Sequence, residues 1–144
     1  MGYCTYQRRA KFRILAADKP AALAQVKHLV SQKDKMGGGS WSGGKRMTSC
    51  FSWVDMVGLE GSTTLEAALE AWRWEAETSE STGDITTINF MGEKLGDDVT
   101  LFEALARYVE SGSFIEMQGE DGALWRWCFD NGKFSEKGAT ISWE

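Results

Sequence analysis

The hydrophobic period of this chain changes abruptly at Trp72, from that of a helix to that of a strand. Up to that point Leu65, Leu69 and Trp72 recur at the spacing of a helix that buries one face. From there Trp72, Trp74 and Ala76 alternate with charged residues, which is the two-residue period of a strand with one buried side. A helix must end and a strand begin within a few residues, so the fold combines both elements closely.

The rest of the chain repeats this combination of short helices and strands. Apolar stripes behind capping residues predict two more helices, the last capped by Asp97 or Asp98, and Asn131-Gly132 predicts a tight turn. Because short turns join successive strands, most strand pairs are expected to be antiparallel. The sequence predicts one α+β domain over 1–144, a twisted, mostly antiparallel sheet of about six strands with three helices packed on one face. The predicted helices lie near 18–30, 64–72 and 97–108, and the predicted strands near 6–15, 48–57, 72–77, 85–90, 113–118, 123–129 and 137–143.

Two of these predicted segments carry alternating charge. In the first strand Tyr6, Arg8, Ala10, Phe12 and Ile14 would share the buried side, with Gln7, Arg9, Lys11 and Arg13 forming a basic outer face. Arg73 and Arg126 each stand between two tryptophans, so we expect them to point away from the core and to pair with acids such as Glu75 or Glu116. The seven tryptophans are most simply core residues, and an aromatic pocket is the alternative. Residues 64–79 and 100–115 are weakly similar in sequence. A duplication would explain this similarity, and so would the general likeness of capped amphipathic helices.

Composition excludes several classes of protein. No apolar run approaches the about 18 residues that cross a membrane, and the first residues lack the apolar stretch of an export signal. The three cysteines are far apart and His28 is the single histidine, so the sequence offers neither a disulfide framework nor a zinc motif. We expect a cytoplasmic protein with reduced cysteines, without a metal or cofactor. No feature selects an oligomeric state.

The charge of the chain is divided unevenly along its length. Residues 1–47 hold ten Lys and Arg against two Asp, a balance of +8. Residues 48–144 hold six bases against 19 acids, a balance of −13. Such asymmetry is typical of a polar binding surface, although the basic third could also simply pack beside the acidic remainder.

The segment 37–49, GGGSWSGGKRMTS, partly matches a phosphate-binding P-loop. Gly39, Gly44 and Lys45 have the right spacing, but Arg46 stands where a P-loop needs Ser or Thr to hold magnesium. The order is also reversed, because a predicted helix precedes the segment and a predicted strand follows it. We therefore predict a flexible Gly/Ser-rich loop at 33–47, in which Trp41 stacks on a ligand while Lys45 and Arg46 meet an anion; plain disorder is the alternative.

Catalytic chemistry has little support in the sequence. A nucleophilic triad needs a base, and His28 lies on the predicted solvent face of its helix. Carboxylates could act as acid and base, but capping and turn roles explain them as well. No catalytic or metal-binding residue is predicted. The loop carboxylates are Glu93, Asp97, Asp98, Glu120 and Asp121.

From residue 65 onward the amino-acid sequence resembles a family of small, uncharacterised bacterial and phage-associated proteins. The resemblance is carried by GEKLGDD at 92–98, YVESGS at 108–113 and IEMQGEDGALWRW at 115–127. It covers residues 65–144 and implies no activity. It implies an accessory protein carried on a phage or mobile element, and such proteins often bind and block host defence components.

These observations lead to three functional hypotheses. The first is a non-enzymatic binding protein that inhibits or modulates a host defence protein, with charged surfaces supplying orientation and aromatic anchors supplying affinity. The second is a sponge or sensor for a small anion such as a nucleotide signal, and the third is a carboxylate-based enzyme. A long nucleic acid is disfavoured, because the acidic two thirds of the chain would repel it. The predicted contact residues are Trp41, Lys45, Arg46, Arg9, Lys11 and Arg13.

Overall fold

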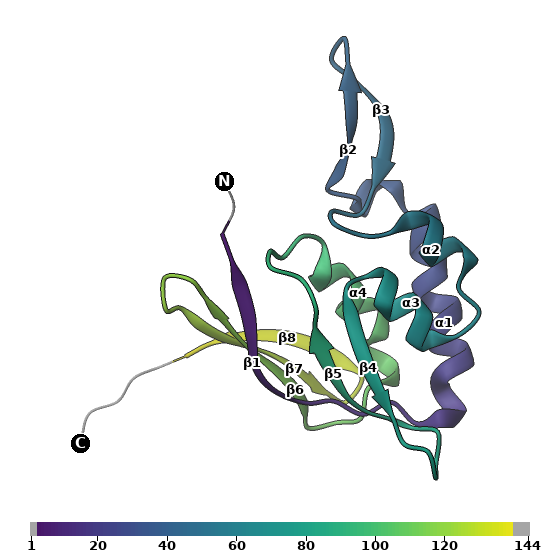
Figure 1. The fold of residues 1–144 in the computed structure, drawn as a ribbon, viewed down its shortest axis with the longest axis vertical. Helices are drawn as coiled ribbons and strands as arrows, with labels where there is room; N and C mark the ends of the chain where they lie inside the picture. The colour runs from purple at the N-terminus through teal and green to yellow at the C-terminus, as the bar shows by residue number, and fades with distance from the viewer. Residues whose placement is uncertain (1–2, 140–144) are drawn as a thin grey trace.

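The computed structural model describes residues 3–139, and two neighbouring antiparallel sheets form its frame (Figure 1). The larger sheet has the strand order β1-β6-β7-β8, and the smaller one is the hairpin β4-β5. The predicted α+β fold with mostly antiparallel strands is confirmed. The strands are β1 (Thr5–Lys11), β4 (Trp74–Thr78), β5 (Ile85–Phe90), β6 (Ser113–Gly119), β7 (Leu124–Asp130) and β8 (Lys133–Gly138).

The two sheets are joined along β1 and β5. Ile14, just after β1, exchanges backbone hydrogen bonds with Ile85, with N···O distances of 3.0 and 2.9 Å. Farther along, the amide side chain of Gln7 donates to the carbonyl of Ile88 and accepts from the N–H of Phe90. The Gln7 side chain thus links the two sheets where no backbone ladder joins them. These sheets hold six strands, and the described residues hold eight strands in all, against about six predicted.

Four α-helices lie within the described residues, one more than predicted, and α1, α3 and α4 are grouped on one side of the strands (Figure 1). The Thr64 hydroxyl accepts from the N–H of Ala67 at the start of α3, and Asp55 caps the extra short helix in the same way through Gly58. The helices are α1 (Lys19–His28), α2 (Met56–Gly61), α3 (Leu65–Ala71) and α4 (Asp98–Leu105), with single 3₁₀ turns η1 (Ala16–Asp18), η2 (Leu29–Ser31), η3 (Lys33–Lys35) and η4 (Ala106–Tyr108).

Aromatic rings fill the space between the helices and the sheets. Trp74, Phe102 and Trp127 are buried, and the ring of Phe102 lies 4.9 Å from that of Trp74 and 5.3 Å from that of Trp127. These rings come from β4, α4 and β7, so one stack connects both sheets to the helical layer. Core packing therefore accounts for these two tryptophans, as the sequence predicted.

A β-bulge changes the predicted faces of β1. The register with β6 shifts between Gln7 and Arg9, so one extra residue stands on β1 at that point. The shift moves Gln7 to the core side, next to β5, and leaves Tyr6 on the same side as Arg9 and Lys11. The predicted alternation was right after the bulge, where Phe12 and Ile14 are buried, and wrong before it.

The segment predicted as an irregular loop at 33–47 contains regular structure. After η3 the chain forms the hairpin of β2 (Gly38–Ser42) and β3 (Lys45–Cys50), which projects from the body of the molecule (Figure 1). Gly43 and Gly44 both have positive φ, 58° and 78°, which is what a two-residue turn between twisted strands requires. Gly43 and Gly44 are therefore turn residues, whereas Gly38 and Gly39 belong to β2. The strand predicted at 48–57 ends at Cys50.

The carboxylates of Asp97 and Asp98 hold this region together instead of capping α4. Asp97 accepts hydrogen bonds from the N–H groups of Gly37 and Ser52, at 2.9 and 2.7 Å. It therefore binds the two chain segments that flank the projecting hairpin. Asp98, only 1% exposed, accepts from Trp74 Nε1 at 2.9 Å and from Arg73 at 3.3 Å. The predicted pairing of Arg73 with Glu75 or Glu116 was wrong, because its φ of 70° turns the chain between α3 and β4.

We expect Asp98→Ala to lower the free energy of unfolding by about 3–5 kcal/mol, because it leaves the half-buried Arg73 guanidinium without its counter-charge and the Trp74 N–H without an acceptor. Urea denaturation measures the change. Glu103→Ala, an exposed carboxylate on the same helix, is the matched control and should change stability by no more than about 0.5 kcal/mol. Equal stability of the two variants would contradict the central role of Asp98.

Candidate functional site

One side of the larger sheet carries no helix, and its outward side chains form a continuous surface that we call the open sheet face. We identify the residues of this face from the strand register, because directly paired residues of neighbouring strands point to the same side of a sheet. Each alternates with a residue on the helical side, such as Ile115 or Trp127. The open sheet face comprises Tyr6, Arg8, Arg9 and Lys11 of β1, Phe114, Glu116 and Gln118 of β6, Leu124, Arg126, Cys128 and Asp130 of β7, and Lys133, Ser135 and Lys137 of β8.

A single carboxylate, that of Glu116, stands among three guanidinium groups at the centre of this surface. Arg126 donates to it at 2.8 Å, and the Nε atoms of Arg9 and Arg8 lie 3.5 and 3.8 Å away. The hydrogen bond from Arg126 is the main cause that lowers the pKa of Glu116, partial burial opposes it, and the charges of the arginines add to the lowering. Glu116 therefore stays ionised but cannot neutralise three cations.

The same arginines stack on an aromatic ring. The guanidinium carbon of Arg126 lies 4.5 Å from the ring centre of Phe114, and that of Arg9 lies 5.5 Å from it. The half-buried ring attracts both cations through its π face and holds them in place. Cationic planar groups are thus presented on a rigid strand scaffold.

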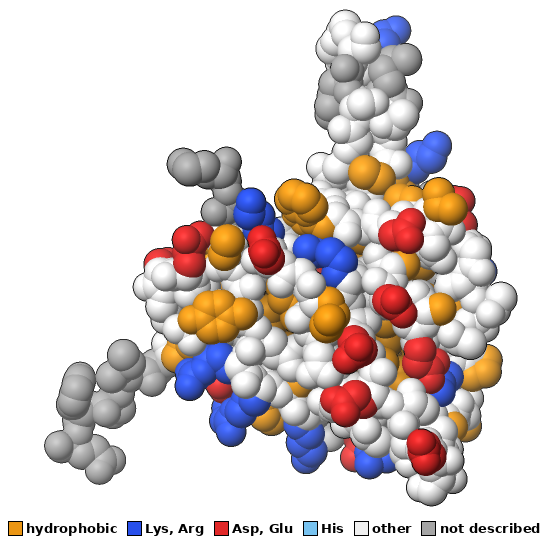
Figure 2. Space-filling model, in the orientation of Figure 1, with side chains coloured by type: hydrophobic (Ala, Val, Ile, Leu, Met, Phe, Trp, Pro, Cys, Tyr) orange, Lys and Arg blue, Asp and Glu red, His pale blue; other side chains and the backbone are white. Residues whose placement is uncertain are grey.

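Positive charge is in excess over the whole surface. Six Lys and Arg side chains belong to the open sheet face, against the two carboxylates of Glu116 and Asp130. Lys11 and Lys137 are exposed, and within the described residues neither has an ion pair. In Figure 2, Lys and Arg gather along the lower left of the body, whereas Asp and Glu lie mainly over the β4-β5 hairpin and the helices.

The structure brings together only part of the contact residues predicted from the sequence. Arg9 and Lys11 belong to the open sheet face. Arg13 lies beyond the end of β1, where it is paired with Asp84 at 2.8 Å and with Glu110 at 3.5 Å.

The predicted contact residues of the glycine-rich segment lie elsewhere. Lys45 is at the end of the projecting hairpin, away from the open sheet face (Figure 1). The backbones of Trp41 and Arg46 pair across that hairpin, and the predictions for their side chains lie outside what the structure describes. The basic surface and the glycine-rich segment are therefore separate.

Sequence reasoning missed the cations that the end of the chain contributes. Arg126, Lys133 and Lys137 come from the acidic two thirds of the sequence, and strand order places them beside β1 and β6. The predicted pairing of Arg126 with Glu116 is confirmed, and it was the available signal. Extending this pairing by one strand would have identified Lys137 of β8, which lies opposite Arg126 of β7.

A hollow lies on the side of the larger sheet opposite to the open sheet face. It has a volume of about 520 Å³ and is lined by aromatic side chains that include Trp53, Trp125 and Trp127. Trp53, predicted on a strand, lies in a turn with φ of 66° and is 60% exposed, a conformation that bulky residues rarely adopt. At the rim, a hydrogen bond to the Asp121 carboxylate raises the pKa of Tyr3 to about 12.

Comparison with known proteins adds no relative. No protein-family model, curated protein or solved structure matches the chain. Within residues 3–139, no group of three or more His, Cys, Asp or Glu side chains is arranged to hold a metal ion, and none of the helices has the length and apolar character needed to cross a membrane. The resemblance over residues 65–144 stays a prediction.

The depressed pKa of Glu116 predicts a defined pH dependence of stability. Its contribution is fully present above the ordinary pKa near 4.5 and is lost as the pH falls through the lower folded-state value. Urea denaturation of Glu116→Gln between about pH 3 and 6 should therefore show a smaller loss of stability on acidification than the unaltered protein. Glu75→Gln, at an exposed position of β4, is the control and should follow the unaltered protein. Identical profiles for both variants would contradict the proposed role of the arginines.

Proposed function

We propose that this protein is a non-enzymatic binding protein whose open sheet face binds short stretches of single-stranded nucleic acid. The observation that carries the proposal is the excess of cations on a helix-free sheet, where two guanidinium groups stack over Phe114. Proteins that bind single strands combine a positively charged path for phosphates with planar groups on which bases stack. The open sheet face offers both.

Aromatic and cationic groups lie at spacings that suit an extended strand. Tyr6, 51% exposed, stands on β1 near one end of the surface, and Phe114 with its two arginines stands near the other. Lys11 on β1 and Lys137 on β8 stand on the two outer strands of the larger sheet and would contact phosphates. Neighbouring strands are about 4.8 Å apart, so these groups reach across a surface of about 15 Å.

A protein partner fits this surface less well. Lys and Glu are depleted at protein–protein interfaces, although Arg is enriched there, and the open sheet face carries three Lys and the central Glu116. Interfaces with nucleic acid are more polar and more positive. At the level of the sequence, a long nucleic acid is disfavoured because the acidic part of the chain would repel a polyanion. That objection weakens when three cations from the acidic part join the basic strand on one face.

The biological setting remains the one suggested by the sequence. A phage or mobile-element accessory factor that acts on host defence is a hypothesis resting on the resemblance over residues 65–144. Binding of exposed single strands is one activity by which such a factor would interfere with host defence. This setting carries no weight in the proposal for the open sheet face.

Fluorescence anisotropy with a labelled oligothymidylate of about 20 nucleotides tests the proposal. The triple variant Arg9→Ala/Lys11→Ala/Lys137→Ala should bind about tenfold or more weakly, and the slope of log affinity against log salt should fall by about 2. Glu116→Gln should bind more tightly, because it removes the negative charge at the centre of the surface.

The matched control is Lys35→Ala/Lys45→Ala/Arg107→Ala, which removes the same charge from elsewhere on the molecule. It should retain the affinity of the unaltered protein within about twofold. Equal loss in both triple variants would mean that only net charge matters and would overturn the proposed site. Absence of binding at about 50 mM salt would overturn the nucleic-acid proposal itself.

A further inference from the structure

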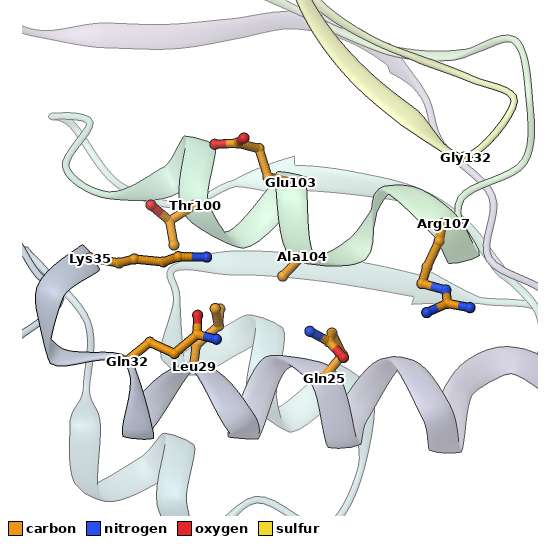
Figure 3. A pocket seen from close by; sticks show the side chains of 9 residues that line it. All are labelled: Gln25, Leu29, Gln32, Lys35, Thr100, Glu103, Ala104, Arg107 and Gly132. Atoms are coloured by element: carbon orange, nitrogen blue, oxygen red, sulfur yellow. The ribbon is translucent and has the colours of Figure 1, made fainter.

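A polar cleft separates α1 from α4 on the helical side of the molecule, away from the open sheet face (Figure 3). Its volume is about 550 Å³, within the range of small-molecule sites. Gln25, Leu29 and Gln32 form one wall, and Thr100 and Ala104 form the other. The short side chains of Thr100 and Ala104 leave the space open between the two helices.

Two cations stand at opposite ends of the cleft. Lys35 extends inward beside Thr100, and the Arg107 guanidinium lies at the far end, next to Gln25 (Figure 3). Within the described residues neither has an ion pair, and the carboxylate of Glu103 points away from the wall formed by α1. Thr100 and Arg107 are seven residues apart, which places the two ends about 10 Å from each other.

An acceptor lies at the Lys35 end of the cleft (Figure 3). The side-chain oxygen Oε1 of Gln32 is buried and accepts no hydrogen bond from the described residues. A buried amide oxygen without a donor is costly, so a ligand with an N–H group at the Lys35 end of the cleft would supply the missing hydrogen bond. Charge and hydrogen bonding together call for a ligand with acid groups at both ends and an N–H group close to the acid group that meets Lys35.

The lining also limits the chemical class. None of the nine residues that line the cleft is aromatic, so a nucleobase would find no ring to stack on. Leu29, almost fully buried, offers aliphatic contact instead. We infer that the cleft between α1 and α4 binds an aliphatic dianion with an amide N–H between its two acid groups, the class to which short acidic peptides belong. This inference is independent of nucleic-acid binding.

Titration of ¹⁵N-labelled full-length protein followed by NMR tests it, with succinyl-glycyl-glycine as the probe. This probe carries two carboxylates separated by two amide groups. Saturable shifts should appear at residues 25–35 and 100–107 at probe concentrations up to about 10 mM. Its neutral diamide should cause no saturable shift. Suberate, a dianion of similar length without an N–H, should bind more weakly than the probe.

Variants separate the two contributions. Lys35→Ala/Arg107→Ala should weaken probe binding about tenfold or more, since charge-assisted hydrogen bonds are lost at both ends. Gln32→Leu should abolish the preference for the probe over suberate. Arg9→Ala/Lys11→Ala/Lys137→Ala is the control with altered charge and should bind the probe unchanged. No saturable shift, equal shifts with the diamide, or unchanged affinity of Lys35→Ala/Arg107→Ala would each overturn the inference.

Discussion

One buried carboxylate, that of Asp98, determines how the separate parts of this molecule meet. It receives hydrogen bonds from the start of β4, through Arg73 and Trp74, and from the backbone of Gly96 in the loop before α4. Burial lowers the pKa of Arg73 and the charge of Asp98 opposes this, so each group makes the burial of the other tolerable. The transition from α3 to β4 and the start of α4 are therefore positioned together. Asp97, the preceding residue, holds the base of the projecting hairpin to the same loop.

A second local feature, the β-bulge in β1, links the architecture to the open sheet face. The extra residue places Gln7 toward β5, where its amide joins the two sheets, and leaves Tyr6 and Arg8 on the helix-free side. Without the bulge, the polar bridge and the exposed aromatic would exchange sides. The one inserted residue therefore has two effects. It links the two sheets through Gln7, and it places Tyr6 and Arg8 on the open sheet face.

The two proposed sites differ in a way that their linings explain. The open sheet face is cationic and carries Phe114 with two stacked guanidinium groups, which suits bases and phosphates. The cleft between α1 and α4 is concave, polar and lined without an aromatic ring, which suits a small aliphatic anion. They lie on opposite sides of the sheet, so one site can be altered without touching the other. With a net charge of −5 for the chain, anion binding at either site depends on local cations rather than on the protein as a whole.

Sequence alone determined the class of fold and most of its elements, because periods of 2 and 3.6 residues and capping or turn residues are local signals. The change of period at Trp72, the cap at Thr64 and the turn at Asn131-Gly132 are of this kind. Tertiary structure decided the rest, because strand order and register are set by contacts between distant residues. The bulge at Gln7 and Arg9, the pairing of Arg73 with Asp98, and the meeting of Lys137 with β1 cations on one face depend on packing that no local pattern records. The glycines of the projecting hairpin lie between these cases, since Gly43-Gly44 is a local turn signal whose meaning needed the paired strands on either side.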